Sequence, residues 1–129
     1  IVDTVTKMSS KRTVTVVGYQ GEKVQEEIKG DNLSYVYQHE QNGTGHAVLQ
    51  AKDMLEDFEG NTLVLYGDAP LLTADTLQQM VETHNKSQAV ATILSTCLED
   101  PTGYGRIVRD DNNNFLKIVE QSDLNSKAE

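Results

Sequence analysis

Three polar side chains in this sequence stand directly after apolar, β-branched segments or one glycine beyond them. They are Gln38, Asp68 and Glu120. The Gln38 amide offers a donor and an acceptor, which can match the imide edge of a pyrimidine. The Asp68 carboxylate suits a hard cation such as Mg²⁺, which takes oxygen ligands and shares them with substrate phosphates. The Glu120 carboxylate can accept hydrogen bonds from sugar hydroxyls.

Each of these side chains also has a purely structural interpretation. Asp68 stands shortly before Pro70 and can cap a turn there, and spacing alone does not separate this role from metal binding. Gln38 and Glu120 can be solvated residues at strand ends. The types of residue therefore indicate candidates, and their positions in a fold must decide between the alternatives.

Two glycine-containing turns are the next candidates. Residues 41–46 carry Gly43 and Gly45 around Thr44 and lead from a predicted strand into a predicted helix. Glycines allow the backbone to approach a ligand closely, although an ordinary turn capped by Thr44 explains the same pattern. The turn lacks the Lys-Ser/Thr of a Walker loop. A second glycine pair surrounds a tyrosine in residues 103–106, which is typical of a tight loop.

The histidines and the cysteine do not form a metal-binding pattern. His39, His46 and His84 have no metal-like spacing with one another or with Cys97, so each is interpreted as a surface or capping histidine. Cys97 follows an apolar segment and is expected to be a small core residue. A single cysteine excludes an internal disulfide and fits a reducing cytoplasm.

Composition limits the classes of function. The chain has 129 residues, of which 37% are apolar, and its 11 basic and 20 acidic residues give a formal net charge of −9. This size fits one domain with a modest core. The negative charge argues against sequence-independent binding to nucleic acids, which needs clustered Lys and Arg. No apolar run is long enough to span a bilayer, and no basic amphipathic stretch indicates a membrane surface.

Segments of strand and helix character alternate along the chain, which predicts an α/β fold. We expect a mainly parallel sheet with helices on both faces and a late antiparallel hairpin. In such a sheet, ligands bind beyond the carboxyl ends of the strands, where the candidate residues stand. The expected strands are Thr13–Val17, Leu33–Tyr37, 62–66 and 89–94; the expected helices are 1–8, 22–29, 47–58 and one that begins after Asp75; the expected hairpin joins 105–109 to Phe115–Val119.

Four segments in order carry a resemblance to a known family. They are residues 38–47 (QHEQNGTGHA), 65–72 (LYGDAPLL), 100–109 (DPTGYGRIVR) and 118–120 (IVE). Together they resemble the uridylyltransferase (pyrophosphorylase) domain of the bacterial bifunctional enzymes that make UDP-N-acetylglucosamine. The resemblance covers nearly the whole chain and implies a Rossmann-like nucleotidyltransferase fold. Residues 1–129 would be the middle part of that domain, truncated at both ends.

The resemblance implies a role for several residues. The uracil would be held by Gln38, Gly43 and Thr44. The nucleotide site would be lined by Tyr66, Gly67 and Asp68, and Asp68 would also bind Mg²⁺. N-acetylglucosamine would be contacted by Gly105 and Glu120.

The implied reaction transfers UMP from UTP to N-acetylglucosamine 1-phosphate and releases pyrophosphate. It needs no protein nucleophile, because positioning and charge neutralisation can carry it. Alternatives are another sugar-1-phosphate nucleotidyltransferase and a nucleotide-binding module without catalysis. The resemblance also implies a cytoplasmic enzyme that trimerises through an acetyltransferase half beyond Glu129.

The family's glycine-rich loop, with its Arg and a following Lys, is expected before Ile1. The chain by itself is therefore expected to be inactive, because those cations would face the triphosphate.

Overall fold

The structure, a computed structural model, describes residues 1–123. The chain divides into two compact units, residues 1–92 and a second unit that begins at Ile93. Each unit carries its own small sheet, one parallel and one antiparallel. The chain is therefore mixed α/β, as the sequence predicts.

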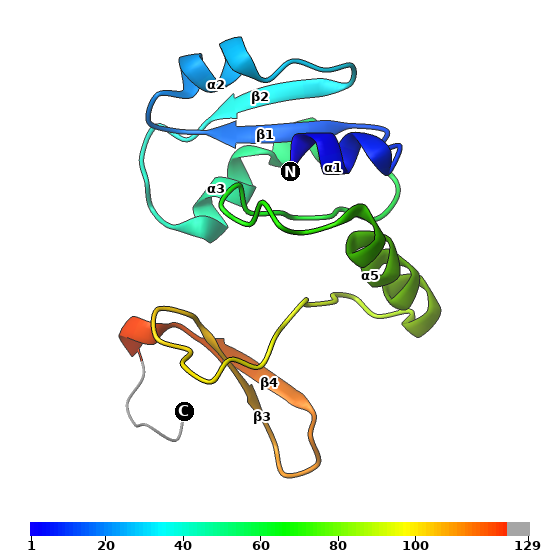
Figure 1. Ribbon diagram of the computed structural model, residues 1–129, viewed down its shortest axis with the longest axis vertical. Coiled ribbons are helices and arrows are strands. Elements are labelled where there is room, and N and C mark those ends of the chain that lie inside the picture. Colours follow the sequence, from blue (N-terminus) through cyan, green and yellow to red (C-terminus); the bar gives the residue numbers. More distant parts are fainter. Residues whose placement is uncertain (124–129) are drawn as a thin grey trace. The chain divides into compact units, whose positions relative to one another are not determined.

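The first unit is built on a parallel pair of strands joined by a helix. After α1 (Val2–Lys7), the chain forms β1 (Thr13–Val17), α2 (Gly21–Glu27) and β2 (Leu33–Tyr37). Figure 1 shows β1 and β2 lying side by side. Their register ends with Val17 opposite Tyr37. Both strands have the predicted bounds, because their β-branched and aromatic side chains suit a pleated surface. Their carboxyl ends meet at one edge.

The helices after β2 differ in detail from the prediction. The expected helix 47–58 is two shorter helices, α3 (Thr44–Gln50) and α4 (Lys52–Leu55), separated at the buried Ala51. The later helix, α5 (Ala74–Ser87), begins at Thr73, whose side chain accepts a hydrogen bond of 3.2 Å from the Thr76 backbone N–H. A cap of this kind satisfies a backbone donor that the helix itself leaves unpaired. Leu77 of α5 is fully buried.

Two predicted strands are not formed, and this prediction was wrong. Residues 62–66 and 89–94 have no regular secondary structure, and neither pairs with another segment of residues 1–123. Val64 and Tyr66 are 53% and 57% exposed, and Val90 is fully exposed. A strand needs a neighbour for its backbone N–H and C=O groups, and apolar composition does not supply one. The parallel sheet therefore has two strands in the described residues rather than four.

The wrongly predicted strand 89–94 also led to a wrong expectation for Cys97. The prediction placed this residue at the end of the strand 89–94, among buried apolar side chains. Its side chain is instead exposed, because the segment before it has no sheet to pack on. The interpretation of Cys97 as a core residue is therefore wrong.

The second unit contains the predicted hairpin. Its strands are β3 (Arg106–Arg109) and β4 (Phe115–Val119), which pair antiparallel with an irregularity between Val108 and Arg109, and the turn η1 (Gln121–Asp123) follows. Figure 1 shows the long loop that joins the two strands. Val119 at the end of β4 is buried.

Asp110 organises the hairpin loop. Its Oδ1 accepts hydrogen bonds from the backbone N–H groups of Asn112 and Asn114, at 2.9 and 2.8 Å. Its Oδ2 accepts a bond of 3.0 Å from the side-chain amide of Asn114. These bonds, chiefly the one from the Asn114 side chain, hold the pKa of the Asp110 carboxyl below its ordinary value. The asparagines thus form a defined turn around one carboxylate.

An ion pair joins the entry of β1 to the region after α4. Arg12 donates to Asp57 Oδ1 at 2.9 Å and also to the Met54 carbonyl. The bond from Arg12, together with its charge, lowers the pKa of the Asp57 carboxyl.

In the part of the chain that the structure describes, no helix has the length and apolar character that a membrane crossing needs.

Candidate functional site

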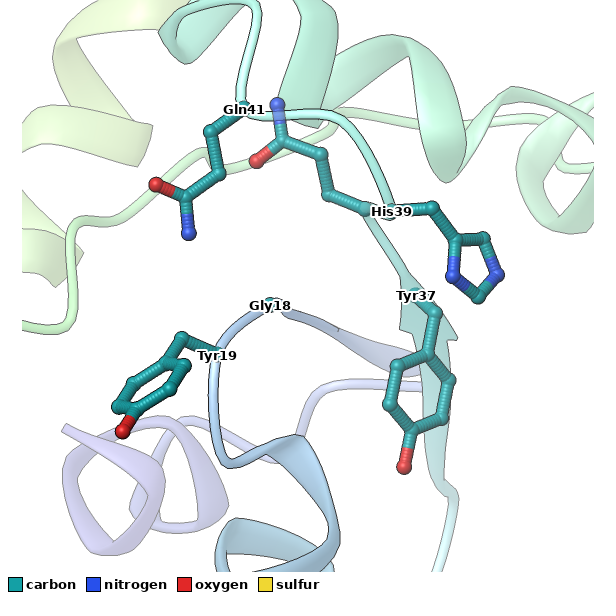
Figure 2. Close-up of a pocket in the computed structure, with 6 residues that line it drawn as sticks. Gly18, Tyr19, Tyr37, His39 and Gln41 are labelled. Atoms are coloured by element: carbon teal, nitrogen blue, oxygen red, sulfur yellow. The ribbon is translucent and has the colours of Figure 1, made fainter.

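A cleft of about 290 Å³ lies at the carboxyl ends of β1 and β2. It is lined by Gly18, Tyr19, Tyr37, Gln38, His39 and Gln41. Figure 2 shows the Gln41 amide directed toward Gly18, with the ring of Tyr19 projecting beside that glycine. The rings of Tyr37 and His39 stack, with centroids 5.8 Å apart. The cleft is where ligands bind in parallel α/β sheets, and it includes one predicted residue, Gln38.

The side-chain amide of Gln38 is held in one orientation. Its Nε2 donates a hydrogen bond of 3.1 Å to the Gly43 carbonyl and lies 3.0 Å from Nδ1 of His46. A carbonyl oxygen can accept but not donate, so the nitrogen of the amide must face Gly43. A His46 ring that accepts at Nδ1 also uses the second N–H group of Gln38 within the protein. Its Oε1 takes part in none of the hydrogen bonds among residues 1–123, so this acceptor is open to a ligand.

Gly43 precedes the first residue of α3 and has a backbone that other residues rarely adopt. Its φ is 93° and its ψ is 176°, a region that is essentially restricted to glycine. Apart from its two chain neighbours, no residue of the described part of the chain has an atom within 4 Å of the place where a Cβ would stand, so the space beside this backbone is open. Thr44 is the first helical residue and does not cap α3 through its side chain. The alternative interpretation of the turn, with Thr44 as its cap, is therefore wrong.

The segment Tyr66, Gly67 and Asp68 is exposed and forms a turn instead of a strand end. The backbone N–H of Ala69 donates to the Tyr66 carbonyl at 3.4 Å. The Asp68 carboxylate makes no ion pair or side-chain hydrogen bond with any described residue. A free carboxylate oxygen fits a hard divalent cation, provided that substrate phosphates supply further oxygens. No cluster of three or more potential ligands for a metal occurs within residues 1–123.

The predicted sugar-binding residues lie together in the second unit. A Cβ built on Gly105 would be 3.6 Å from Oε2 of Glu120 and 3.2 Å from Cγ2 of Ile118. The absence of a side chain at Gly105 therefore leaves room beside the Glu120 carboxylate. Glu120 itself is exposed and makes no ion pair with residues 1–123. The sequence predicted these two residues as one group, and the hairpin brings them together.

The loop before β3 is fixed by Arg106 and Gln121. Arg106 donates to the carbonyls of Pro101 and Tyr104 and, at 3.0 Å, to Oε1 of Gln121. The same Gln121 oxygen accepts a bond of 3.1 Å from the Gly103 backbone N–H. These contacts define the shape of the loop around Gly105.

The start of that loop has its own hydrogen bonds. Oδ1 of Asp100 accepts from the Thr102 hydroxyl and the Thr102 backbone N–H, at 2.6 and 3.1 Å. The bond from the hydroxyl, first, and the bond from the backbone N–H lower the pKa of the Asp100 carboxyl. Asp100 is therefore a charged turn residue that shapes the loop.

One residue of the site was interpreted too simply from the sequence. His46, expected to be an ordinary surface or capping histidine, is half-buried and contacts the Gln38 amide. The other ring nitrogen, Nε2, lies 3.2 Å from Nε2 of Gln50. A signal was present, since His46 stands in the first turn of a helix that begins directly after the glycine turn. His46 thereby faces the strand end that carries Gln38.

Comparisons with known proteins give the family. The relatives are each called "Bifunctional protein GlmU": that of Thermoanaerobacter pseudethanolicus is 49% identical over 123 residues, which are 95% of this chain and 26% of the relative. That of Oceanobacillus iheyensis is 45% identical over 97% of this chain and 27% of its own length. That of Listeria welshimeri is 47% identical over 100% of this chain and 28% of its own length.

The chain thus spans about a quarter of the length of the curated relatives that it matches. A family model described as nucleotidyl transferase matches residues 2–126, which is nearly the whole sequence. The resemblance seen in the four sequence segments is confirmed, and the chain belongs to the nucleotidyl transferase family.

Proposed function

We propose that this chain is part of a uridylyltransferase that transfers UMP from UTP to N-acetylglucosamine 1-phosphate. The observation that carries the proposal is the orientation of the Gln38 amide at the end of β2. Both of its N–H groups are used within the protein, which leaves an oxygen acceptor for the ligand. Uracil presents an N3–H donor on its imide edge and therefore complements that acceptor. The open backbone at Gly43 would face the same base.

The proposed reaction exchanges one phosphoanhydride bond for another. A phosphate oxygen of N-acetylglucosamine 1-phosphate attacks the α-phosphorus of UTP, the bond from that phosphorus to the bridging α–β oxygen breaks, and pyrophosphate leaves. Catalysis of this kind depends on positioning and on stabilising the charge that develops on the phosphates. Asp68 would hold Mg²⁺, which neutralises part of the triphosphate charge when it is bound.

Glu120 would accept hydrogen bonds from the hydroxyls of the sugar, with Gly105 leaving space beside it. Tyr66 and Gly67 would line the nucleotide site, and Thr44 would contact the base from the start of α3. The activity is proposed for the full-length protein, because the chain spans about a quarter of the length of its relatives. The whole protein would be a cytoplasmic trimer that uses these two substrates.

The test is pyrophosphate release by the full-length natural polypeptide that contains this sequence. It is supplied with Mg²⁺, N-acetylglucosamine 1-phosphate and each nucleoside triphosphate in turn, and residues 1–129 are assayed beside it. Turnover with UTP, and little with CTP, ATP or GTP, supports the proposal. Turnover with another base points to a different sugar-1-phosphate nucleotidyltransferase. Nucleotide binding without any turnover points to a non-catalytic module, and substantial turnover by residues 1–129 overturns the expected inactivity.

A further inference from the structure

The His46 ring connects α3 to the strand end that carries Gln38. Nδ1 of His46 lies 3.0 Å from Nε2 of Gln38, and the contact is partly buried. The nitrogen of an amide carries no acceptor, so this contact is a hydrogen bond only if the ring nitrogen accepts. The ring must then be neutral, with a lone pair on Nδ1 and its proton on Nε2.

A second amide competes for the ring. Nε2 of Gln50 lies 3.2 Å from Nε2 of His46, and a neutral imidazole has only one accepting nitrogen. Gln50 has another acceptor, the backbone carbonyl of His46 at 3.2 Å. The contact to Gln38 is the shorter one, and the Gln38 amide is also anchored at Gly43. These differences assign the lone pair to Nδ1, where it faces Gln38.

Resting on the proposed function, we infer that His46 is a positioning residue that sets base selectivity through the Gln38 amide. The ring accepts one N–H of Gln38 and the Gly43 carbonyl accepts the other. A reversed amide would place its oxygen against the Gly43 carbonyl and against the ring lone pair, which are two repulsive contacts. The oxygen of the amide is therefore kept toward the ligand.

This fixed orientation distinguishes uracil from cytosine. Uracil offers N3–H to the amide oxygen, whereas N3 of cytosine carries a lone pair and would face that oxygen without a hydrogen bond. If the Gln38 amide could reverse its orientation, its N–H₂ group would donate to cytosine N3, and the selectivity for uracil over cytosine would fall. His46 supplies one of the two contacts that prevent this reversal, so its loss should reduce selectivity without abolishing it.

A pair of variants of similar size isolates the accepting nitrogen. In His46→Asn, the amide oxygen can occupy the place of Nδ1 and still accept from Gln38, whereas His46→Leu fills the space without an acceptor. The control is His84→Leu, since His84 is also partly buried and also uses Nδ1 in a hydrogen bond, 2.9 Å from the Thr92 hydroxyl, but it does not line the cleft. Gln50→Leu removes the competing amide.

The experiment measures KM and kcat for UTP and CTP with the full-length natural polypeptide and these variants. We expect His46→Leu to lower the ratio of kcat/KM for UTP over that for CTP roughly tenfold, the value of one modest hydrogen bond. His46→Asn, Gln50→Leu and His84→Leu should keep the wild-type ratio. Calorimetry would report the folding of each variant separately.

The outcomes separate this inference from the proposed function. A wild-type protein without preference for UTP would contradict the proposed function itself. A selective wild type with an equally selective His46→Leu variant overturns the role of His46 and leaves the function standing. Loss of selectivity in Gln50→Leu would overturn the assignment of the lone pair to Nδ1. If His46→Leu does not fold, His46→Gln replaces it, because its longer side chain carries the acceptor away from the Nδ1 position.

Discussion

The loop after β2 and the loop before β3 hold their candidate binding residues in different ways. In the first loop, the Gln38 side chain also holds the loop together, because its amide nitrogen contacts both the Gly43 carbonyl and the His46 ring. In the second, Arg106 and Gln121 make the bonds that shape the loop, and Glu120 stands beside them without sharing that task. Binding and structure are therefore coupled at Gln38 and separable at Glu120.

The two candidate subsites should therefore respond differently to mutation. A change at Gln38 removes a proposed ligand contact and two internal hydrogen bonds at once. A change at Glu120 removes a proposed ligand contact and should leave the loop intact. Asp68 belongs to neither loop, and its proposed metal would act on the phosphates of the nucleotide. Variants at these positions, assayed in the full-length natural polypeptide, test whether the two loops differ in this way.

The largest expected effect is at Asp68, in the segment that neither loop contains. Asp68→Asn keeps the volume of the side chain but removes its charge. It should lower kcat roughly 10²–10³-fold, which is the usual effect of removing one charge-stabilising group from an enzyme active site. Pyrophosphate release across a range of Mg²⁺ concentrations is the measurement. Asp53→Asn, on the exposed side of α4, is the matched control and should behave as wild type. Near-normal turnover by Asp68→Asn would remove this residue from the metal site.

Gln38→Ala should have the next largest effect and should show the coupling directly. We expect UTP affinity to fall by roughly 1–3 kcal/mol, because a ligand donor loses its acceptor. The melting temperature should fall as well, since the Gly43 carbonyl and the His46 ring lose their partner. Titration calorimetry with UTP and thermal unfolding would measure the two effects, with Gln79→Ala on the exposed face of α5 as the control. Unchanged UTP affinity would contradict the proposed base contact.

The sequence predicted the positions of Gln38 and Glu120 in the fold better than it predicted the sheet. Gln38 and Glu120 were expected directly after strands, and β2 and β4 have the predicted bounds. Residues 62–66 and 89–94 have the same apolar composition but no pairing partner in the described residues. The composition of a segment indicates its tendency to form a strand. Whether the strand forms depends on a second segment that pairs with it, which the composition of the first segment does not reveal.

The contact of His46 with Gln38 was likewise not predictable from the sequence. It contacts Gln38 from eight residues away, across the glycine turn and the beginning of α3. The contact depends on the φ of 93° at Gly43, which turns the chain into the helix. A histidine without metal-like spacing is most simply interpreted as a surface residue, and the one signal in the sequence, its place directly after the glycine turn, does not identify Gln38 as its partner. Such a contact becomes visible once the path of the backbone is known.

Glu120→Ala should give a smaller and more selective effect than Gln38→Ala. We expect KM for N-acetylglucosamine 1-phosphate to rise roughly tenfold, from the loss of a hydrogen bond to a charged acceptor, while KM for UTP stays nearly constant. The melting temperature should not change, because Arg106 and Gln121 still hold the loop. Steady-state kinetics with each substrate varied would test this, with Glu99→Ala as the control. Equal changes in both KM values would mean that the two loops are not separable in the way proposed.

The smallest expected effect is at Asp110, which serves neither candidate subsite. Hydrogen bonds from Asn114 hold the pKa of its carboxyl below the ordinary value, so the folded state favours the charged form. The stabilisation is complete above the ordinary aspartate pKa of about 3.9 and disappears as the pH falls through the lower pKa of the folded state. Asp110→Ala should therefore loosen the hairpin loop near neutral pH without altering KM for either substrate.

Carboxyl-carbon NMR would follow the titration of Asp110, and amide exchange at Asn112 and Asn114 would report the loop. Asp111→Ala is the matched control, because the neighbouring carboxylate makes no hydrogen bond or ion pair with residues 1–123. Exchange should be faster in Asp110→Ala and unchanged in Asp111→Ala, and the difference between them should vanish in acid, where Asp110 is protonated in both the folded and the unfolded state. A changed KM for N-acetylglucosamine 1-phosphate in Asp110→Ala would show that the sugar subsite extends along the hairpin. The loop before β3 would then not be sufficient to hold Glu120 in place.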